Sequence, residues 1–154
     1  GESHRSLVGY CGLYCDACGI RQGRIRKAVE NLRKVIGAYG IDKVGPGFAR
    51  WEPAFRHYAE YEKVLDAFVK MFGECPGCIS GGGNPACAVR ACSKKRGHAT
   101  CADCVDMSAC EKLRRHKWPS KVLPEIKAMG VDRWAGGMRR KVSEGFCYLD
   151  EKIQ

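Results

Sequence analysis

Residues 75–110 read CPGCISGGGNPACAVRACSKKRGHATCADCVDMSAC and contain seven of the eleven cysteines of the chain. The spacing Cys-x-x-Cys occurs twice in this stretch and once near the N-terminus, at Cys75/Cys78, Cys101/Cys104 and Cys15/Cys18. Across a tight turn, this spacing directs both sulfurs to one point, where they can bind a shared zinc ion at about 2.3 Å. The stretch has few large apolar side chains, so we expect metal binding to supply its folding free energy.

The cysteine count favours metal ligation over a disulfide framework. Eleven is odd, so pairing within the chain leaves at least one thiol over. Small secreted domains with disulfides follow a signal peptide, and none is visible in this sequence. We therefore expect reduced thiols and a cytoplasmic protein, with residues 1–6 a tag remnant or disordered.

Length and composition are those of one globular domain, which we place at residues 7–150. The chain has 154 residues, of which 45% are hydrophobic and 29% charged. No apolar run approaches the roughly 20 residues of a membrane span, so no membrane partner is expected. The formal net charge is +10, but a zinc ion with four thiolates carries −2, so two such sites would together subtract four. The basic excess therefore partly balances the predicted metal sites.

Two amphipathic runs predict a helical hairpin over residues 19–73. Apolar residues recur at helical spacing within 25–39 and again within 55–72, and a glycine follows each run. The segment 41–51 between them contains Gly-Pro-Gly and is predicted to be a connecting loop. Because the two helices are about equally long, we expect the hairpin to return Cys75 close to Cys18.

Shorter helices are predicted after the hairpin. Asn84-Pro85 is typical of a helix start and Gly97 of its end, while Ser108 with Glu111 resembles a capping box for the next helix. Two more amphipathic runs follow, and no segment alternates as a strand does. The predicted fold class is all-α, with three parts: the helical hairpin 19–73, a cysteine knuckle segment 74–116 and C-terminal helices 119–145.

All cysteines are candidate metal ligands: Cys11, Cys15, Cys18, Cys75, Cys78, Cys87, Cys92, Cys101, Cys104, Cys110 and Cys147. Cys87 and Cys92 are five residues apart on a predicted helix and would point about 140° apart, so one ion is not expected to take both. Cys92 then joins Cys101, Cys104 and Cys110 in a set of four thiolates.

The other ligand sets stay open. Cys75, Cys78 and Cys87 lack a fourth ligand, which one of the N-terminal cysteines can supply. Those candidates are Cys11, Cys15 and Cys18. Cys147 could complete the N-terminal group instead, or remain a buried free thiol. If the helix begins only after Cys87, a set that combines Cys75, Cys78 and Cys87 with Cys92 becomes another alternative.

Two further features lie between the cysteines. His98 could replace one thiolate in a Cys₃His site. Gly81-Gly82-Gly83 lacks the Gly-Lys-Ser/Thr ending of a phosphate-binding loop, and we predict a flexible spacer there.

No nucleophile–base pair or carboxylate pair stands at catalytic spacing, so we assign no catalytic residue and expect no enzyme activity.

Four motifs stand along the chain: Cys11-Gly-Leu-Tyr-Cys-x-x-Cys, Cys75-Pro-Gly-Cys, Cys87-x-Val-Arg-x-Cys92 and Cys101-Ala-Asp-Cys104-x₅-Cys110. As a set they resemble the DUF3795 family, small cysteine-rich proteins of bacteria and archaea without an assigned function. The resemblance covers nearly the whole chain and implies metal binding but no particular reaction. Where many members have a proline before Cys110, this chain has Ala109. Some members carry another cysteine where this chain has Gly81–Asn84.

These observations predict a non-enzymatic zinc-binding module. The alternative is a [4Fe–4S] protein with a redox or electron-transfer role, because thiolates serve both zinc and iron–sulfur clusters. Cys11-x₃-Cys15-x₂-Cys18 has the spacing of radical S-adenosylmethionine enzymes, but those need a barrel of roughly 200 residues or more. A protein partner is also expected, of a kind that the sequence does not specify.

A weaker alternative is a zinc module that binds nucleic acid. Basic residues form three runs, at Arg21–Lys34, Lys112–Lys121 and Arg139–Lys141, and Trp118 lies beside the second. Nucleic-acid binding requires such runs to converge on one surface with exposed aromatic rings. Solvated helix faces are the simpler explanation.

Overall fold

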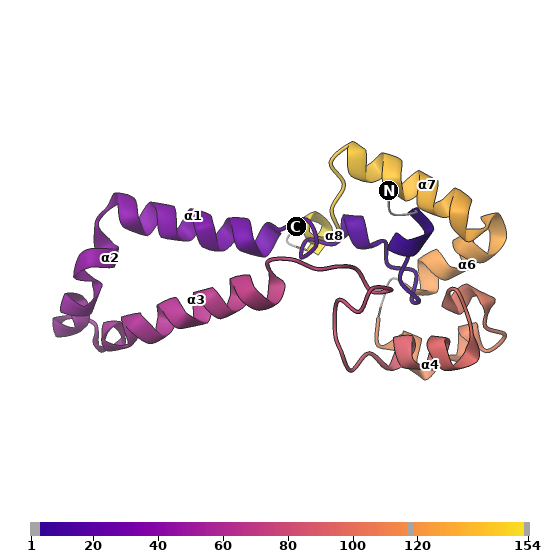
Figure 1. Ribbon diagram of the computed structural model, residues 1–154, viewed down its shortest axis with the longest axis horizontal. Helices are drawn as coiled ribbons and strands as arrows, with labels where there is room; N and C mark the ends of the chain where they lie inside the picture. Colours follow the sequence, from indigo (N-terminus) through magenta and orange to yellow (C-terminus); the bar gives the residue numbers. More distant parts are fainter. Residues whose placement is uncertain (1–3, 117–118, 153–154) are drawn as a thin grey trace. The chain divides into compact units, whose positions relative to one another are not determined.

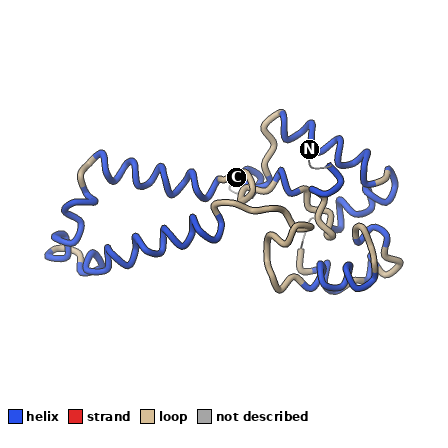
Figure 2. Tube along the Cα trace, in the orientation of Figure 1, coloured by secondary structure: helices blue, strands red, loops and turns tan. Residues whose placement is uncertain are grey.

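Figure 1 shows a computed structural model of the chain, which describes residues 4–116 and 119–152. They form helices and 3₁₀ turns joined by loops (Figure 2), so the predicted all-α class is confirmed. The one β-type pairing among these residues is an isolated bridge between Val8 and Tyr14. Within the same ranges, every helix is too short or too polar to cross a bilayer.

The chain divides into two units. Unit 1 comprises Gly1–Arg21 and Cys75–Gln154, and unit 2 comprises Gln22–Glu74. All eleven cysteines lie in unit 1. The candidate metal chemistry therefore belongs to one unit, and the helical hairpin to the other.

Unit 2 contains the two predicted long helices. They are α1 (Arg24–Ala38) and α3 (Tyr58–Phe72). Gly73 directly follows α3, and Gly40 follows the C-cap Tyr39 of α1, so both glycines lie at the helix ends as expected. The predicted loop 41–51 is wrong, because that segment is itself helical: α2 (Ile41–Val44) and η3 (Gly45–Arg50). The predicted first turn of the second helix is a separate 3₁₀ helix, η4 (Pro53–His57). Proline stands in the first turn of both η3 and η4, where its fixed φ suits helical geometry.

Ion pairs join the two long helices of unit 2. The Arg33 guanidinium donates to Glu62 at 3.0 Å and to Asp66 at 2.8 Å. Nearer the open end of the hairpin, Arg26 donates to Glu74 at 3.1 Å. Because Arg26 pairs with a residue beyond α3 and Arg33 with the middle of α3, the helices run antiparallel, as Figure 1 shows.

Unit 1 is built from many short elements. In chain order they are η1 (His4–Leu7), η2 (Cys15–Ala17), α4 (Ala88–Arg96), η5 (Cys101–Asp103), η6 (Met107–Ala109), α5 (Glu111–Arg114), α6 (Pro119–Met129), α7 (Val131–Ser143) and α8 (Tyr148–Lys152). The two C-terminal helices α6 and α7 match the predicted runs, and Gly130 separates them.

The core of unit 1 forms around the N-terminal segment. Val8 and Tyr14 are fully buried, and the Tyr14 ring meets the Trp134 ring of α7 edge-to-face at 6.3 Å. Leu123 and Ile126 of α6 complete the same apolar cluster. A backbone hydrogen bond of 2.7 Å from the Cys101 N–H to the Tyr10 carbonyl fixes the cysteine-bearing loop to this segment.

Two predicted helix starts are wrong. Helix α4 begins at Ala88 with Cys87 as its N-cap, and Asn84 instead closes a turn in which its side chain accepts from the Ala86 N–H at 2.9 Å. An Asn side chain bonds the backbone two residues on in such turns as readily as it caps a helix. The N-cap of α5 is Cys110, so Ser108 does not cap that helix.

A capping box does exist, at η5. The Thr100 hydroxyl accepts from the Ala102 N–H at 3.2 Å, and the Asp103 carboxylate accepts from the Thr100 and Ala99 N–H groups at 3.1 and 3.0 Å. Thr100 is itself buried. These bonds hold the turn that carries Cys101 and Cys104.

We predict that Thr100→Ala destabilises unit 1 by about 1 kcal/mol, because a cap of this kind is worth that much. Ser108→Ala is the matched control, and its effect should stay within about 0.5 kcal/mol. Urea unfolding followed by circular dichroism measures both changes. Equal shifts of the two midpoints would show that the capping box contributes nothing.

Candidate metal centre

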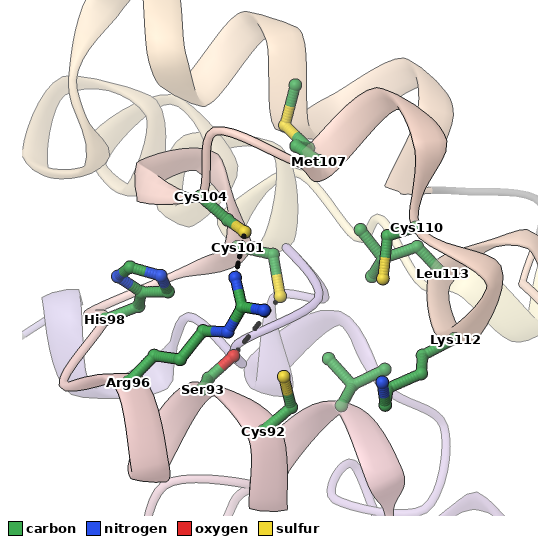
Figure 3. A pocket seen from close by; sticks show the side chains of 11 residues that line it. Cys92, Ser93, Arg96, His98, Cys101, Cys104, Met107, Cys110, Lys112 and Leu113 are labelled. Atoms are coloured by element: carbon green, nitrogen blue, oxygen red, sulfur yellow. Dashed lines mark hydrogen bonds between the residues drawn. The ribbon is translucent and has the colours of Figure 1, made fainter.

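Four cysteines line one small cavity in unit 1, which we call the knuckle cavity. They are Cys92 from α4, Cys101 from η5, Cys104 directly after η5, and Cys110 directly before α5. The cavity has a volume of about 20 Å³. Figure 3 shows the four sulfurs turned toward the space between α4 and the segment that follows it.

Polar side chains of α4 contact two of these sulfurs. The Ser93 hydroxyl lies 3.3 Å from Cys101 Sγ, and the Arg96 guanidinium donates to Cys104 Sγ at 3.4 Å (Figure 3). Arg96 also binds Asp106 at 3.1 Å, which fixes its direction. Burial raises the pKa of the Cys101 thiol, while the Ser93 hydrogen bond acts against that rise.

The cationic side chains beside the cavity oppose the charge of thiolates. Arg96 and Lys112 both line it. The pKa of Arg96 is raised, first by its bond to Asp106 and then by the nearby Cys104 and Cys92 thiols. His98 also lines the cavity, but in Figure 3 it lies at the edge, beyond Arg96. Thiols therefore surround the cavity, and the imidazole lies at its rim.

A second group of thiols lies where the N-terminal segment meets the loop after unit 2. We call Cys11, Cys15, Cys75 and Cys78 the N-terminal thiol group. The Cys78 N–H donates to Cys15 Sγ at 3.3 Å. The thiol of Cys78 donates to the same sulfur and lowers the pKa of Cys15 to about 7, against the effect of burial.

We assign Cys11 and Cys75 to this group because their charges act on Cys78, although Cys11 also acts on Cys101 of the knuckle cavity. The pKa of Cys78 is raised by its hydrogen bond to Cys15, then by burial, and then by the charges of Cys15, Cys11 and Cys75. The chain returns here with Cys78 in contact with Cys15, and Cys11 and Cys75 are close enough to interact with Cys78. The predicted approach of Cys75 to Cys18 stays a prediction. Arg21 fixes the return through a 3.0 Å bond to the Cys75 carbonyl.

Glycines make room for these sulfurs. A Cβ on Gly82 would lie 2.6 Å from Cys75 Sγ, and one on Gly77 would lie 3.6 Å from Cys15 Sγ. Gly82 also donates its N–H to the Gly77 carbonyl at 2.8 Å. Gly82 is thus buried against a cysteine, where no side chain would fit, while Gly81 and Gly83 are exposed. The flexibility predicted for Gly81–Gly83 stays a prediction.

The structure shows which cysteines of the predicted four-thiolate set lie together. Cys92 lines the knuckle cavity with Cys101, Cys104 and Cys110, but the helical angle that was to separate Cys92 from Cys87 does not apply. Because α4 begins only after Cys87, that residue and Cys92 are not related by helical geometry. The alternative set with Cys75, Cys78, Cys87 and Cys92 thus stays open, but Cys92 lines the knuckle cavity and Cys87 does not.

Three predicted ligands belong to neither group. Cys18 follows η2 and Cys87 precedes α4, and both are half-buried. Cys147 lies after α7 and is 1% exposed, which is the burial expected of a small apolar side chain. All eleven cysteines are free thiols.

The four thiols of the knuckle cavity line a common space without meeting at one coordination point. Among the residues that the structure describes, no three His, Cys, Asp or Glu side chains are placed closely enough to hold a metal ion as they stand. The donor chemistry nevertheless fits zinc or iron–sulfur, because both select thiolate ligands. The small volume of the knuckle cavity fits a single ion.

Three residues of the basic runs make contacts within the described part of the chain, and nucleic-acid binding stays a prediction. Arg21 is bonded to Asp16 at 2.7 Å, Lys112 lines the knuckle cavity, and Arg139 contacts His4. Lys117 and Trp118 of the second run lie outside the described residues.

Sequence reasoning missed the residues that contact the sulfurs. Ser93 and Arg96 follow Cys92 at one and four residues, which places them on the turn of α4 nearest the cavity. A serine directly after a cysteine and an arginine one helical turn later are the signals that could have indicated them. The run Gly81–Gly83 was a further signal, because a glycine can mark close packing against a side chain as well as flexibility.

The fold and the thiol groups define a cysteine-rich all-α domain with candidate metal ligands in unit 1. Comparison with protein families then gives one match, to the family described as "Protein of unknown function (DUF3795)", over residues 7–115. The chain belongs to this family, as its motifs predicted. Comparisons with curated proteins and with solved structures give no match.

We predict that Gly82→Ala destabilises unit 1 by about 1–3 kcal/mol, because the added methyl must displace Cys75 or the Gly77 backbone. Gly136→Ala is the matched control. In α7 no atom lies within 4 Å of the position that its added methyl would take, and alanine favours a helix, so stability should stay equal or rise by up to about 1 kcal/mol. Thermal melting of both variants tests this, and a melting temperature of Gly82→Ala equal to the wild type would contradict the close packing.

Proposed function

We propose that this chain is a non-enzymatic zinc-binding protein whose first centre is a Cys₄ site formed by Cys92, Cys101, Cys104 and Cys110. The supporting observation is that these four cysteines line one cavity of about 20 Å³. A cavity of that size holds about one water-sized sphere, which suits one ion better than an eight-atom cluster. Four thiolates would complete the tetrahedral coordination that zinc prefers.

The role we propose for this ion is structural. A zinc ion with four protein ligands has no open position for a substrate, so it stabilises the fold without reacting. The segment from α4 to α5 buries few large side chains, chiefly Val89 and Leu113, and metal ligation would supply the missing folding free energy. Arg96 and Lys112 would offset the net charge of −2 that zinc with four thiolates carries.

We propose a second centre at the N-terminal thiol group, formed by Cys11, Cys15, Cys75 and Cys78. It is supported by the two hydrogen bonds from Cys78 to Cys15 Sγ and by the electrostatic contacts of Cys11 and Cys75. The alternative occupant here is a [4Fe–4S] cluster with an electron-transfer role. N–H···S hydrogen bonds like that of Cys78 favour it, because they tune cluster potentials.

Free thiols in these numbers suit a reducing compartment such as the cytoplasm. We propose that the bound metal keeps a surface of the protein folded there, and that a protein partner binds this surface.

Metal analysis and a visible absorption spectrum of protein purified without oxygen test the occupants. Two equivalents of zinc in a colourless protein are expected, and this result would end the iron–sulfur alternative. A brown protein with iron and sulfide would support the cluster at the N-terminal thiol group. A folded protein that binds neither element would refute the metal proposal.

We predict that Cys104→Ser removes one equivalent of metal and unfolds the segment around η5, while the second equivalent stays bound. Cys15→Ser should do the reverse and leave the knuckle cavity loaded. Cys147→Ala is the control, because Cys147 belongs to neither group, and it should keep both equivalents. Metal-to-protein ratios after dialysis give the result. Loss of both equivalents in each single variant would mean that the cysteines are grouped differently.

Arg96 is expected to tune the knuckle site through its bond to Cys104 Sγ. We predict that Arg96→Gln weakens zinc binding by about 10–100-fold, the usual effect of removing a partner of a metal ligand. Lys95→Gln removes the same charge from an exposed neighbour and should leave the affinity within about threefold. Competition with a chromophoric chelator measures both affinities. If both variants weakened zinc binding equally, Arg96 would act only through its positive charge and not through its bond to Cys104.

A further inference from the structure

Unit 2 leaves an apolar face uncovered. In its two long helices the buried side chains are Val29 of α1 and Leu65 of α3. Five other large apolar side chains of these helices are 42–68% exposed. They are Leu32, Val35, Val64, Phe68 and Met71, and we call them the apolar face. Exposed apolar residues grouped in this way mark an interaction site more often than scattered ones do.

Helical geometry places these residues on one side of each helix. At about 100° per residue, Leu32 and Val35 lie about 60–120° to one side of Val29. By the same measure, Val64, Phe68 and Met71 lie about 60–120° to the corresponding side of Leu65. Each helix therefore carries a second apolar stripe beside the one that packs within the hairpin.

The ion pairs show that both stripes share one side of the hairpin. On α1, Arg33 lies on the side of Val29 opposite to the apolar stripe, and on α3, Glu62 and Asp66 lie on the side of Leu65 opposite to its stripe. Because Arg33 bonds to both carboxylates, the charged side of α1 and the charged side of α3 face the same way. Since α1 and α3 run antiparallel, the opposite sides, which carry the apolar stripes, also face the same way.

We propose that this face binds the same face of a second copy of the chain, so that two hairpins form a four-helix bundle. A pair of helices can bury one stripe each, and a second pair is needed to bury the other. Closed two-fold dimers are the commonest assemblies of identical chains. The helices have equal length, 15 residues each, so two hairpins can cover each other from end to end.

The net charges of α1 and α3 favour a second copy of the chain in one particular orientation. Helix α1 has five Arg and Lys residues and one Glu, whereas α3 has three Asp and Glu residues and two Lys. Stacking α1 on α1 would bring two positive helices together, which is unfavourable. A two-fold axis parallel to the helices instead places α1 on α3 of the second copy, and the helix charges are then of opposite sign at both contacts.

The register of the hairpin agrees with this arrangement. Leu32 directly precedes Arg33 in the chain, and Val64 lies between Glu62 and Asp66, so the Arg33 bonds put Leu32 and Val64 level with each other. A two-fold axis parallel to the helices leaves each residue at the same height along that axis in both copies. Leu32 of one copy then packs on Val64 of the other at the centre of the interface.

Sedimentation of the full chain over a concentration series tests the proposal. We expect a dimer of twice the 17.1 kDa chain mass. Val64→Lys should raise its dissociation constant by at least about tenfold, because a charge would be buried at the interface centre. Met71→Lys is a second test at the most exposed position of the face, where the fold of the monomer is least affected.

Ala59→Lys is the matched control, since it adds the same charge to the exposed ion-pair side of α3. It should leave the dissociation constant unchanged, and circular dichroism should show equal helix content in all variants. A chain that stays monomeric throughout the series would overturn the proposal, and so would a dimer that tolerates both lysines on the face.

Discussion

Unit 1 depends on the packing of its N-terminal segment against loops that come from much later in the chain. Tyr14 is completely buried against Trp134, and the Tyr10 carbonyl accepts the Cys101 N–H at 2.7 Å. The Cys15 sulfur of the same segment accepts the Cys78 N–H. One short stretch of backbone thus contacts both cysteine-bearing loops.

Large apolar side chains and thiols come mainly from different elements of unit 1, although Cys15 and Cys101 belong to the same apolar core. The helices α6 and α7 supply large side chains such as Leu123 and Trp134, and they contain no cysteine. The loops around α4 and η5 supply the thiols and few large apolar groups. Where hydrophobic contacts are few, capping bonds, glycine contacts and hydrogen bonds to sulfur fix the backbone. This division is the physical reason to place metal ions where the apolar core is thin.

Periodicity made the long helices predictable, because apolar spacing reports directly on which residues face a partner. It gave α1, α3, α6 and α7 close to their observed bounds. Single-residue signals were less reliable. Asn84 could cap a helix or close a turn, and sequence cannot separate the two because the same side-chain oxygen serves both. Cys87 became the N-cap instead, so the geometric reason for separating it from Cys92 was lost.

The grouping of the cysteines could be predicted only in part. Cys101, Cys104 and Cys110 are close in sequence, so local turns bring them together. The approach of Cys78 to Cys15 depends on the whole hairpin between them. The equal length of its helices predicted a return of Cys75 close to Cys18, but not the contact between Cys78 and Cys15. Contacts to the sulfurs from Arg96 and Gly82 required the three-dimensional path of the backbone.

The chain leaves unit 1 at Arg21 and rejoins it at Cys75, and the bond between these two residues closes unit 1 at that point. Topologically, the hairpin is an insertion into an otherwise continuous domain. Its arms could lengthen or shorten in steps of one helical turn, about 5.4 Å, without moving either end. Evolution could therefore vary the reach of the hairpin among relatives while the thiol-bearing end stays the same.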